Sequence, residues 1–311
     1  MDIILHVGAH RTATTSFQRY LRANSDAIGT SGTGVWGPLR TRKGLFSGMF
    51  PGPAMQGRSP DRVKGRVSLQ LSRARDAGVV RLLVSDENMI GSSRQCVRTG
   101  SLFPAAGDRM ARYCAVFDGA ITRVMLNIRS PETWWASAAA YAISRGHGVP
   151  DAAQLDRIAT SGRGWRDVIT DLACAVPNAE IKIAPFEEFA GRPDPLLSEA
   201  TGVQAPRDRD HYWLNRAPDL PALRAILVER GQNPDLLPDE TGHWNPFTEA
   251  QTDVLRETYS DDLFWLAAGA DGLAQLTENP ARNRAGTSQP TGDTRKGHSH
   301  DSRQRDMAQS G

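Results

Sequence analysis

Short apolar runs alternate along the chain with longer stretches in which apolar residues recur every three or four positions. The runs have the length and the β-branched content of buried strands, and the stretches between them have helical periodicity. This alternation predicts an α/β fold: a mainly parallel sheet flanked by helices. The strands are expected at residues 3–7, 79–85, 122–128 and 180–186, and the helices at 14–23, 60–77, 108–117, 132–145, 165–177, 221–230 and 249–266.

Two segments break the pattern. Residues 29–53 are rich in Gly, Ser, Thr, Pro and Arg, and we expect a long, partly ordered loop there. Residues 279–311 have Met307 as their only apolar residue besides alanine, too little to bury, which predicts a disordered tail. The sequence therefore predicts a single domain over residues 1–278, followed by this tail.

Composition and charge narrow the function only a little. The 311 residues are 39% hydrophobic and 23% charged, as in ordinary globular proteins. A formal net charge of +2 is too close to neutral to predict a nucleic-acid or membrane partner. Nothing in the sequence predicts an oligomeric state.

The cysteines and the N-terminus bear on the compartment. Cys96, Cys114 and Cys174 lie far apart without CxxC spacing, which predicts free thiols in a reducing compartment rather than disulfides or a zinc site. No apolar run approaches the roughly 20 residues of a transmembrane helix, and the first residues lack the pattern of a signal peptide. We expect a cytoplasmic protein with no transmembrane segment and no bound metal.

Each of the first three predicted strands ends in a polar cluster: "GAHRTATTS", "SDEN" and "RSPE". Parallel strands end at one edge of a sheet, where α/β proteins bind ligands. The first cluster has a glycine for the turn, a basic residue, and hydroxyls at the start of a helix, which together suit a phosphate-linked anion. It is neither a GxxxxGK[ST] loop nor a GxGxxG turn. The alternative is an ordinary strand-to-helix turn with a threonine N-cap.

Two stretches resemble one family. "HVGAHRTATTSFQ" resembles the 5′-phosphosulfate-binding loop of sulfotransferases that use 3′-phosphoadenosine 5′-phosphosulfate (PAPS), whose bacterial members carry H-K-T-G-T-T-S after a strand. "LNIRSPETWWAS" is similar to their 3′-phosphate motif, with Arg129 ending a strand and Ser137 eight residues later. With weaker likeness elsewhere, the resemblance spans about residues 1–270. It implies a P-loop NTPase-like sulfotransferase fold and metal-free transfer of a sulfuryl group from PAPS to an acceptor hydroxyl or amine.

The resemblance also implies a role for individual residues. Arg11 is expected to stabilise the leaving phosphate, and Arg129 and Ser137 to hold the 3′-phosphate. Arg11 stands where the family usually has lysine, and Ala13 where it usually has glycine; arginine keeps the charge, whereas alanine is restricted at positive φ. The loop residues expected to bind the cofactor are His10, Arg11, Thr12, Ala13, Thr14, Thr15 and Ser16.

Transfer also needs a base that takes the proton of the acceptor. Glu87, just past the second predicted strand, is the first candidate, because burial in a cleft can raise the pKa of a carboxylate into a useful range. Its neighbour Asp86 is the rival unless it only faces solvent, and His10 and His147 are weaker candidates.

Two other functions stay open at this point. One is a P-loop-type kinase of small molecules or nucleotides, which would need ATP and Mg²⁺ and lacks the Walker lysine here. The other is a catalytically weakened nucleotide-binding module, suggested by Arg11 and Ala13. The acceptor, whether a carbohydrate, a lipid or a small molecule, is not predicted; residues 29–53 and 145–163 are expected to shape its pocket.

Overall fold

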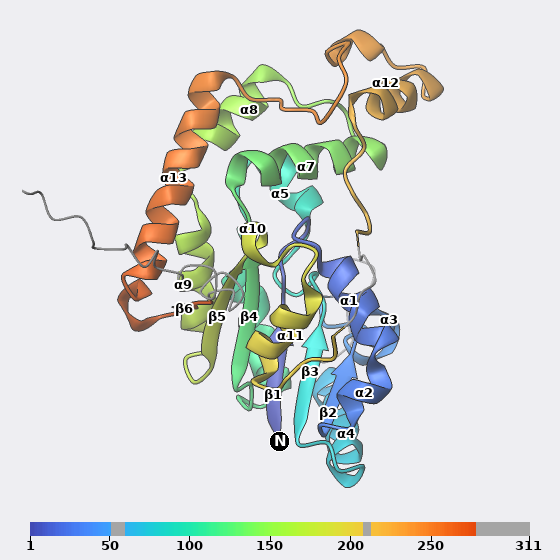
Figure 1. Ribbon diagram of the computed structural model, residues 1–311, viewed down its shortest axis with the longest axis vertical. Helices are drawn as coiled ribbons and strands as arrows, with labels where there is room; N and C mark the ends of the chain where they lie inside the picture. Colours follow the sequence, from blue (N-terminus) through green and yellow to red (C-terminus); the bar gives the residue numbers. More distant parts are fainter. Residues whose placement is uncertain (51–59, 208–212, 278–311) are drawn as a thin grey trace, which may run out of the picture. The chain divides into compact units, whose positions relative to one another are not determined.

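A computed structural model of the chain describes residues 1–50, 60–207 and 213–277. This part is one α/β domain on a six-stranded parallel sheet in the order β2-β3-β1-β4-β5-β6 (Figure 1). It confirms the parallel sheet flanked by helices expected from the sequence. The predicted tail lies outside the described residues. The strands are β1 (Asp2–His6), β2 (Thr33–Trp36), β3 (Arg81–Ser85), β4 (Arg123–Ile128), β5 (Glu180–Pro185) and β6 (Gln275–Leu276).

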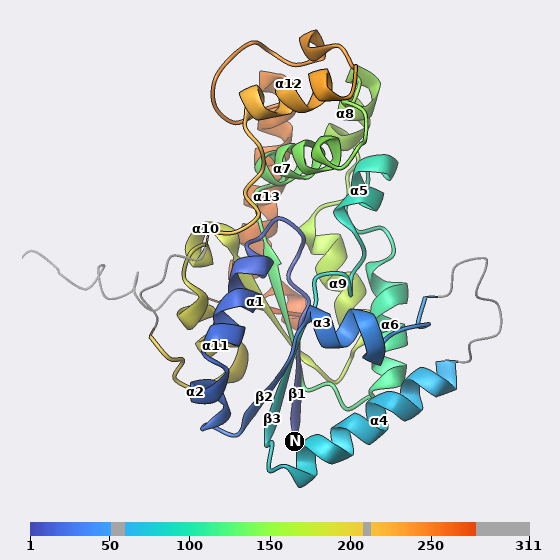
Figure 2. The same cartoon turned by 90° about the vertical axis from the view of Figure 1, so that its right-hand side faces the viewer.

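One face of the sheet packs against three helices. Successive side chains of a strand point to opposite faces, so Ile4, Leu83 and Met125 of the central strands face the same way and join one buried cluster with Phe17 and Leu197 of the helices. Figure 2 shows this helical layer on one side of the sheet. Its helices are α1 (Thr14–Ala23), α2 (Ser25–Gly29) and α11 (Pro193–Thr201).

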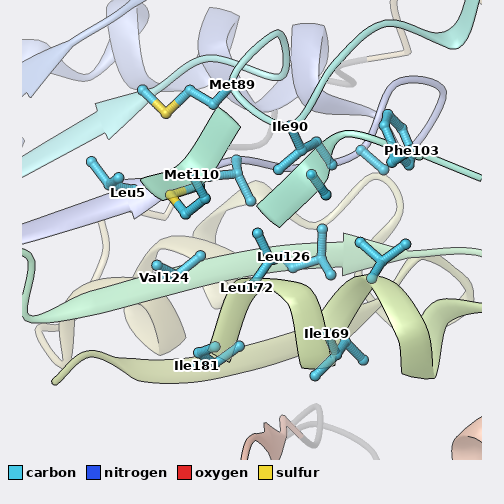
Figure 3. Packing of buried hydrophobic residues seen from close by; sticks show 14 of the residues in the cluster. Leu5, Met89, Ile90, Phe103, Met110, Val124, Leu126, Ile169, Leu172 and Ile181 are labelled. Atoms are coloured by element: carbon cyan, nitrogen blue, oxygen red, sulfur yellow. The ribbon is translucent and has the colours of Figure 1, made fainter. Parts of the chain in front are cut away.

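The opposite face carries the larger core. Figure 3 shows Leu5, Val124 and Leu126 of the sheet packed near Met110 and Leu172 of two covering helices. Strands buried on both faces need the continuous apolar runs that the sequence has at these positions. The helices of this face are α4 (Pro60–Asp76), α6 (Ala106–Val116) and α9 (Trp165–Ala175).

Further helices lie beyond the carboxyl ends of the strands, at the top of Figure 1, and one of them, α13, runs from there down beside α9 to β6. Among them α7 packs against α5, α12 and α13, and its Trp134 is fully buried. These helices surround the edge of the sheet at which the strands end and the polar clusters follow. They are α5 (Ser93–Thr99), α7 (Pro131–Ser144), α8 (Ala152–Ala159), α12 (Leu220–Glu229) and α13 (Glu249–Ala267), with the short α10 (Phe186–Phe189) after β5.

The prediction of a long, partly ordered loop at residues 29–53 is wrong for most of residues 29–50, the part that the structure describes. The segment contains β2, the helical turns α3 (Pro38–Arg40) and η1 (Thr41–Leu45), and the buried Trp36. The stretch "TGVW" is too short and too glycine-containing to show strand periodicity. It becomes a strand because β3 supplies parallel hydrogen-bonding partners along it.

The topology places a ligand-binding edge between β1 and β4, which are neighbours in the sheet. From β1 the chain passes to α1 on one face, whereas from β4 it passes through α7 and α8 to α9 on the other. Connections that leave adjacent strands toward opposite faces open a crevice at the carboxyl ends, where α/β proteins bind ligands. The first and third polar clusters lie at this crevice.

Candidate active site

The loop between β1 and α1 turns sharply at three residues with positive φ. The φ angles are +48° at Gly8, +68° at Arg11 and +62° at Ala13. At Gly8 an added Cβ would lie 2.2 Å from Cγ2 of Thr14, so a larger residue would force the loop to move. The loop is therefore bent back onto the start of α1.

Helix α1 begins directly after this turn and has no side-chain cap. Its N-cap is Ala13 in the left-handed conformation, not a threonine, so the ordinary capped turn considered as an alternative is not what forms. The first N–H groups of a helix have no partner within the helix and lie at its positive end. Thr14, Thr15 and Ser16 of this first turn line a cavity. Such an end attracts an anion.

We expect Ala13→Gly to stabilise the protein. Left-handed backbone costs alanine about 1–2 kcal/mol, and glycine adopts it freely. The greater flexibility of glycine in the unfolded chain offsets about 0.5–1 kcal/mol of that gain. The free energy of unfolding, measured by urea denaturation, should therefore rise by up to about 1.5 kcal/mol. Ala13→Val is the matched comparison and should lower it; a glycine variant less stable than the wild type would show that Ala13 is not strained.

Arg11, Arg129 and Ser137 meet at the carboxyl ends of β1 and β4. Arg11 Nε donates to Ser137 Oγ at 2.9 Å, and its guanidinium lies 5.0 Å from the centre of the Tyr141 ring. Arg129 donates from Nη1 to the carbonyl oxygen of Arg11 at 3.1 Å and from Nε to Thr133 Oγ1 at 3.0 Å. The Ser137 hydroxyl thus supports Arg11, a contact that the motif spacing did not indicate.

The two arginines are poorly solvated and lie near each other. Burial, and next the charge of Arg129, lowers the pKa of Arg11 to about 10; burial also lowers the pKa of Arg129. Both side chains stay protonated at neutral pH. Within the described part of the chain, neither forms a salt bridge with a carboxylate. Partly buried like charges without a direct counterion are costly, so a bound anion would stabilise this site.

These residues line a cavity of about 370 Å³, within the range of small-molecule sites. Among the described residues of its lining the one carboxylate is Glu132, which accepts from Arg256 Nε at 3.2 Å and from the hydroxyl of Ser130. The walls therefore keep an excess of positive charge, and they also offer flat aromatic surface. The cationic and aromatic side chains of the wall are Arg11, Arg129, Arg216 and Arg256, and Phe186, Trp213 and Trp244.

Sequence reasoning missed one wall of the cavity. Residues 213–217 cross the start of α1, where the Leu214 N–H donates to Ser16 Oγ and Asn215 Nδ2 donates to Thr15 Oγ1, each at 3.0 Å. This segment lies about 200 residues from the loop in sequence, and its pattern carries no signal for the contact. The fold alone brings Arg216 to the cavity.

Two residues expected to bind the cofactor do not line the cavity. Thr12 is buried inside the loop, where its hydroxyl donates to the carbonyl oxygen of Ala9 at 2.7 Å. The carbonyl oxygen of His10 accepts from Trp134 Nε1 at 2.6 Å, and its ring pairs with Asn88 at 3.0 Å. Burial lowers the pKa of His10, so the ring is neutral at physiological pH. Both residues shape the loop.

The acids after β3 are held by an arginine. Asp86 is buried, accepts from Thr41 Oγ1 at 2.6 Å and pairs with Arg42 at 2.8 Å, so it does not face solvent. Glu87 pairs with the same arginine at 2.8 Å and accepts from Gln18 Nε2 at 2.8 Å. Burial would raise the pKa of Glu87, but the charge and hydrogen bonds of Arg42 outweigh it and lower the pKa below 4.5. The raised pKa expected for this carboxylate is therefore wrong.

The described residues were also compared with the expectations for a metal site, a membrane span and His147. They include no group of three His, Cys, Asp or Glu side chains that could hold a metal ion. None of their helices is long and apolar enough to cross a membrane. His147 lies in a different, smaller cavity beside α5. No family model, curated protein or solved structure matches the chain.

Proposed function

We propose that the protein is a PAPS-dependent sulfotransferase, which transfers a sulfuryl group to a hydroxyl or amine of an acceptor. One observation carries the proposal: Arg11, Arg129 and the uncapped start of α1 meet in a single cavity. The motif likeness assigns the two arginines, 118 residues apart, to two different phosphate groups of one nucleotide. A cavity holding both is what that assignment requires.

The other walls suit the same ligand. The cavity has the size of a small-molecule site, an excess of positive charge, and three aromatic rings that could contact a base. A nucleotide with a second phosphate would supply the missing counter-charge for Arg11 and Arg129. The three cysteines are free thiols, in line with the cytoplasmic location that we propose.

The chemistry follows from these positions. When bound, PAPS supplies a sulfuryl group joined to a phosphate. Arg11 and the first N–H groups of α1 stabilise the charge that the phosphate oxygen takes up as its bond to sulfur breaks. Arg129 holds the 3′-phosphate and, through the Arg11 carbonyl, the loop. A base accepts the proton of the acceptor as its oxygen or nitrogen bonds to sulfur.

Glu87 stays the proposed base, although it is not among the described residues that line the cavity and lies in the loop after β3. We expect Glu87→Gln to lower turnover by about 10²-fold, the lower end for a general base, because the pairing with Arg42 makes this carboxylate a weak one. Since its pKa is below 4.5, this group should add no limb to the pH–rate profile between about pH 5 and 8. The affinity for nucleotide should not change.

Stability measurements separate this role from a structural one. If Glu87 only pairs with Arg42, the glutamine variant should lose stability at neutral pH and keep its turnover. The difference in stability between the two proteins should vanish as the pH falls through the lowered pKa, because the wild-type carboxylate is then protonated. Asp86→Asn is the comparison and should mainly destabilise, since Asp86 is buried in its ion pair.

The proposal as a whole is tested by titrating the protein with adenosine 3′,5′-bisphosphate, AMP and ATP. Hydrogen bonds to a charged group contribute about 1.5–3 kcal/mol each, so the bisphosphate should bind on the order of 10²-fold more tightly than AMP, without metal. Equal affinity for the bisphosphate and AMP would sink the proposal. Tight binding of ATP only with Mg²⁺ would instead indicate a kinase. A preference for the bisphosphate with no transfer from PAPS to any acceptor would indicate a binding module.

A further inference from the structure

The peptide bond between Arg129 and Ser130 is held at both of its polar ends. The carbonyl oxygen of Arg129 accepts from Trp165 Nε1 at 2.7 Å, and the N–H of Ser130 donates to Glu187 Oε1 at 2.9 Å. Trp165 begins α9 and Glu187 lies in α10, so the two partners come from different elements. The orientation of this peptide sets the direction in which the Arg129 side chain leaves the end of β4. The two contacts therefore help to aim its guanidinium.

Helix α13 in turn holds both of these partners. The hydroxyl of Tyr259 donates to Glu187 Oε2 at 2.9 Å, and Asp262 Oδ2 accepts from the backbone N–H of Trp165 at 2.8 Å. Tyr259 and Asp262 are buried and lie three residues apart, on adjacent turns of α13. Figure 1 shows α13 running past α7 and α9, and it packs against both. One helix thus supports the peptide after Arg129 through two separate side chains.

The contact between Tyr259 and Glu187 is the more specific of the two. Burial, and next the charge of Glu187, raises the pKa of Tyr259, so its hydroxyl stays protonated. A carboxylate only accepts hydrogen bonds, which makes the hydroxyl the donor, and bonds to a charged group are the strong ones. The Tyr259 ring is part of the larger core, so packing fixes where the hydroxyl lies.

Glu187 also adjoins the residue that touches the guanidinium itself. The Arg129 guanidinium lies 4.4 Å from the centre of the ring of Phe186, the residue before Glu187. Phe186 and Arg129 line the same cavity. A displacement of Glu187 would therefore act on Arg129 in two ways: through the backbone N–H of Ser130 and through the Phe186 ring.

We propose that Tyr259 is a positioning residue of the candidate active site, which acts through Glu187 to aim Arg129 at a 3′-phosphate. The inference rests on the proposed function for the identity of this phosphate. Tyr259 is not among the described residues that line the cavity, so its effect on a bound nucleotide is indirect. Its expected contribution is to selectivity: the preference for a nucleotide with a 3′-phosphate over one without it.

The test uses the full chain and compares the wild type with Tyr259→Phe, which removes one hydroxyl and keeps the buried ring. Isothermal titration gives the affinities for adenosine 3′,5′-bisphosphate and for AMP. The ratio of the two should fall by about threefold to tenfold in Tyr259→Phe, less than in Arg129→Ala because the guanidinium is still present. The affinity for AMP should stay nearly constant. A merely structural loss would lower the stability or both affinities and leave the ratio unchanged.

A double-mutant cycle tests the route through Glu187. Removing the charge of Glu187 acts on the phosphate as well, so Tyr259→Phe is also measured within the Glu187→Ala background. In that background it should not change the ratio further, because the carboxylate that Tyr259 contacts is absent. The matched control is Tyr113→Phe, which removes the hydroxyl of another buried tyrosine, on α6, and should leave the ratio at the wild-type value.

Hydrogen exchange of the Ser130 amide, followed by NMR, is a readout that needs no nucleotide. Glu187 accepts from this N–H, so its exchange should be faster in Tyr259→Phe than in the wild type if the tyrosine holds Glu187 in place. Unchanged exchange in Tyr259→Phe overturns the inference, whichever nucleotides the protein binds.

The titrations separate this inference from the proposed function. A Tyr259→Phe protein with the wild-type ratio overturns the positioning role and leaves the sulfotransferase proposal intact. Equal losses from Tyr259→Phe with and without Glu187 also overturn it, because Tyr259 would then act by another route. Equal affinity of the wild type for both nucleotides overturns the proposed function, and the selectivity role with it. A reduced ratio in a protein that transfers nothing from PAPS would support the positioning role in a nucleotide-binding module.

Discussion

Arg11→Ala is expected to slow sulfuryl transfer by about 10²–10³-fold. The guanidinium lies in the cavity with the first turn of α1, where charge develops on the leaving phosphate. Loss of a group aimed at such charge lowers turnover more than it lowers ground-state binding. Turnover and bisphosphate affinity, measured on the same preparation, should therefore separate, with the larger change in turnover. Arg73→Ala is the comparison, since it removes an exposed arginine from α4.

Arg11→Lys is the more discriminating change at this position. Lysine is the usual residue at this position in the family that the loop resembles. The contacts of Arg11 favour a loss: its Nε bonds Ser137 and its flat guanidinium lies over the Tyr141 ring. Lysine has no Nε donor in that position and no flat surface to stack. An Arg11→Lys enzyme that is faster than the wild type would show that the site is not built around a guanidinium.

Arg129→Ala is expected to remove most of the preference for adenosine 3′,5′-bisphosphate over AMP, a change of about 10²-fold in the affinity ratio. A guanidinium can donate two hydrogen bonds to a phosphate, at about 1.5–3 kcal/mol each. The affinity for AMP should stay nearly constant, because AMP lacks the group that Arg129 would contact. Isothermal titration of both nucleotides against both proteins gives the ratio directly.

Arg129 has a second role in the structure, and a separate variant distinguishes that role from phosphate binding. Arg129 also donates to the carbonyl oxygen of Arg11, so its removal could loosen the loop as well. Thr133→Val removes the hydrogen bond that Arg129 Nε donates to a side chain and leaves the charge of Arg129 in place. It should change the affinity ratio by much less than Arg129→Ala does. If AMP and bisphosphate lose affinity equally in Arg129→Ala, the residue supports the loop and does not read the 3′-phosphate.

The sequence by itself determined most elements of the fold. The four predicted strands and seven predicted helices are all present, each within two residues of its expected ends. At the start of α13, Thr248 and Gln251 form a capping box, a pattern contained in four consecutive residues. These features depend on neighbours in the chain: apolar periodicity selects which face is buried, and a cap bonds within its own first turn. Local chemistry is therefore enough to place them.

The sequence also identified part of the candidate site, because the two motifs lie at the carboxyl ends of β1 and β4, which are neighbours in the sheet. Arg11 and Arg129 were each read from a short stretch, and both line one cavity. The positive φ at Ala13, where the resembling family has glycine, was also indicated by the sequence. These properties follow from where a strand stops and what residue follows it.

Tertiary structure alone decided the rest. Ser137 contacts Arg11, and Arg216 reaches the cavity, only because α7 and residues 213–217 pack over the loop. Glu87 looked like a carboxylate that burial would make basic, but Arg42 pairs with it and reverses the direction of the pKa shift. Arg42 comes from a segment without periodicity, whose strand β2 exists because β3 supplies its partners. A pKa depends on every charge within a few ångströms, and an edge strand on its neighbour, so neither could be read from the order of residues.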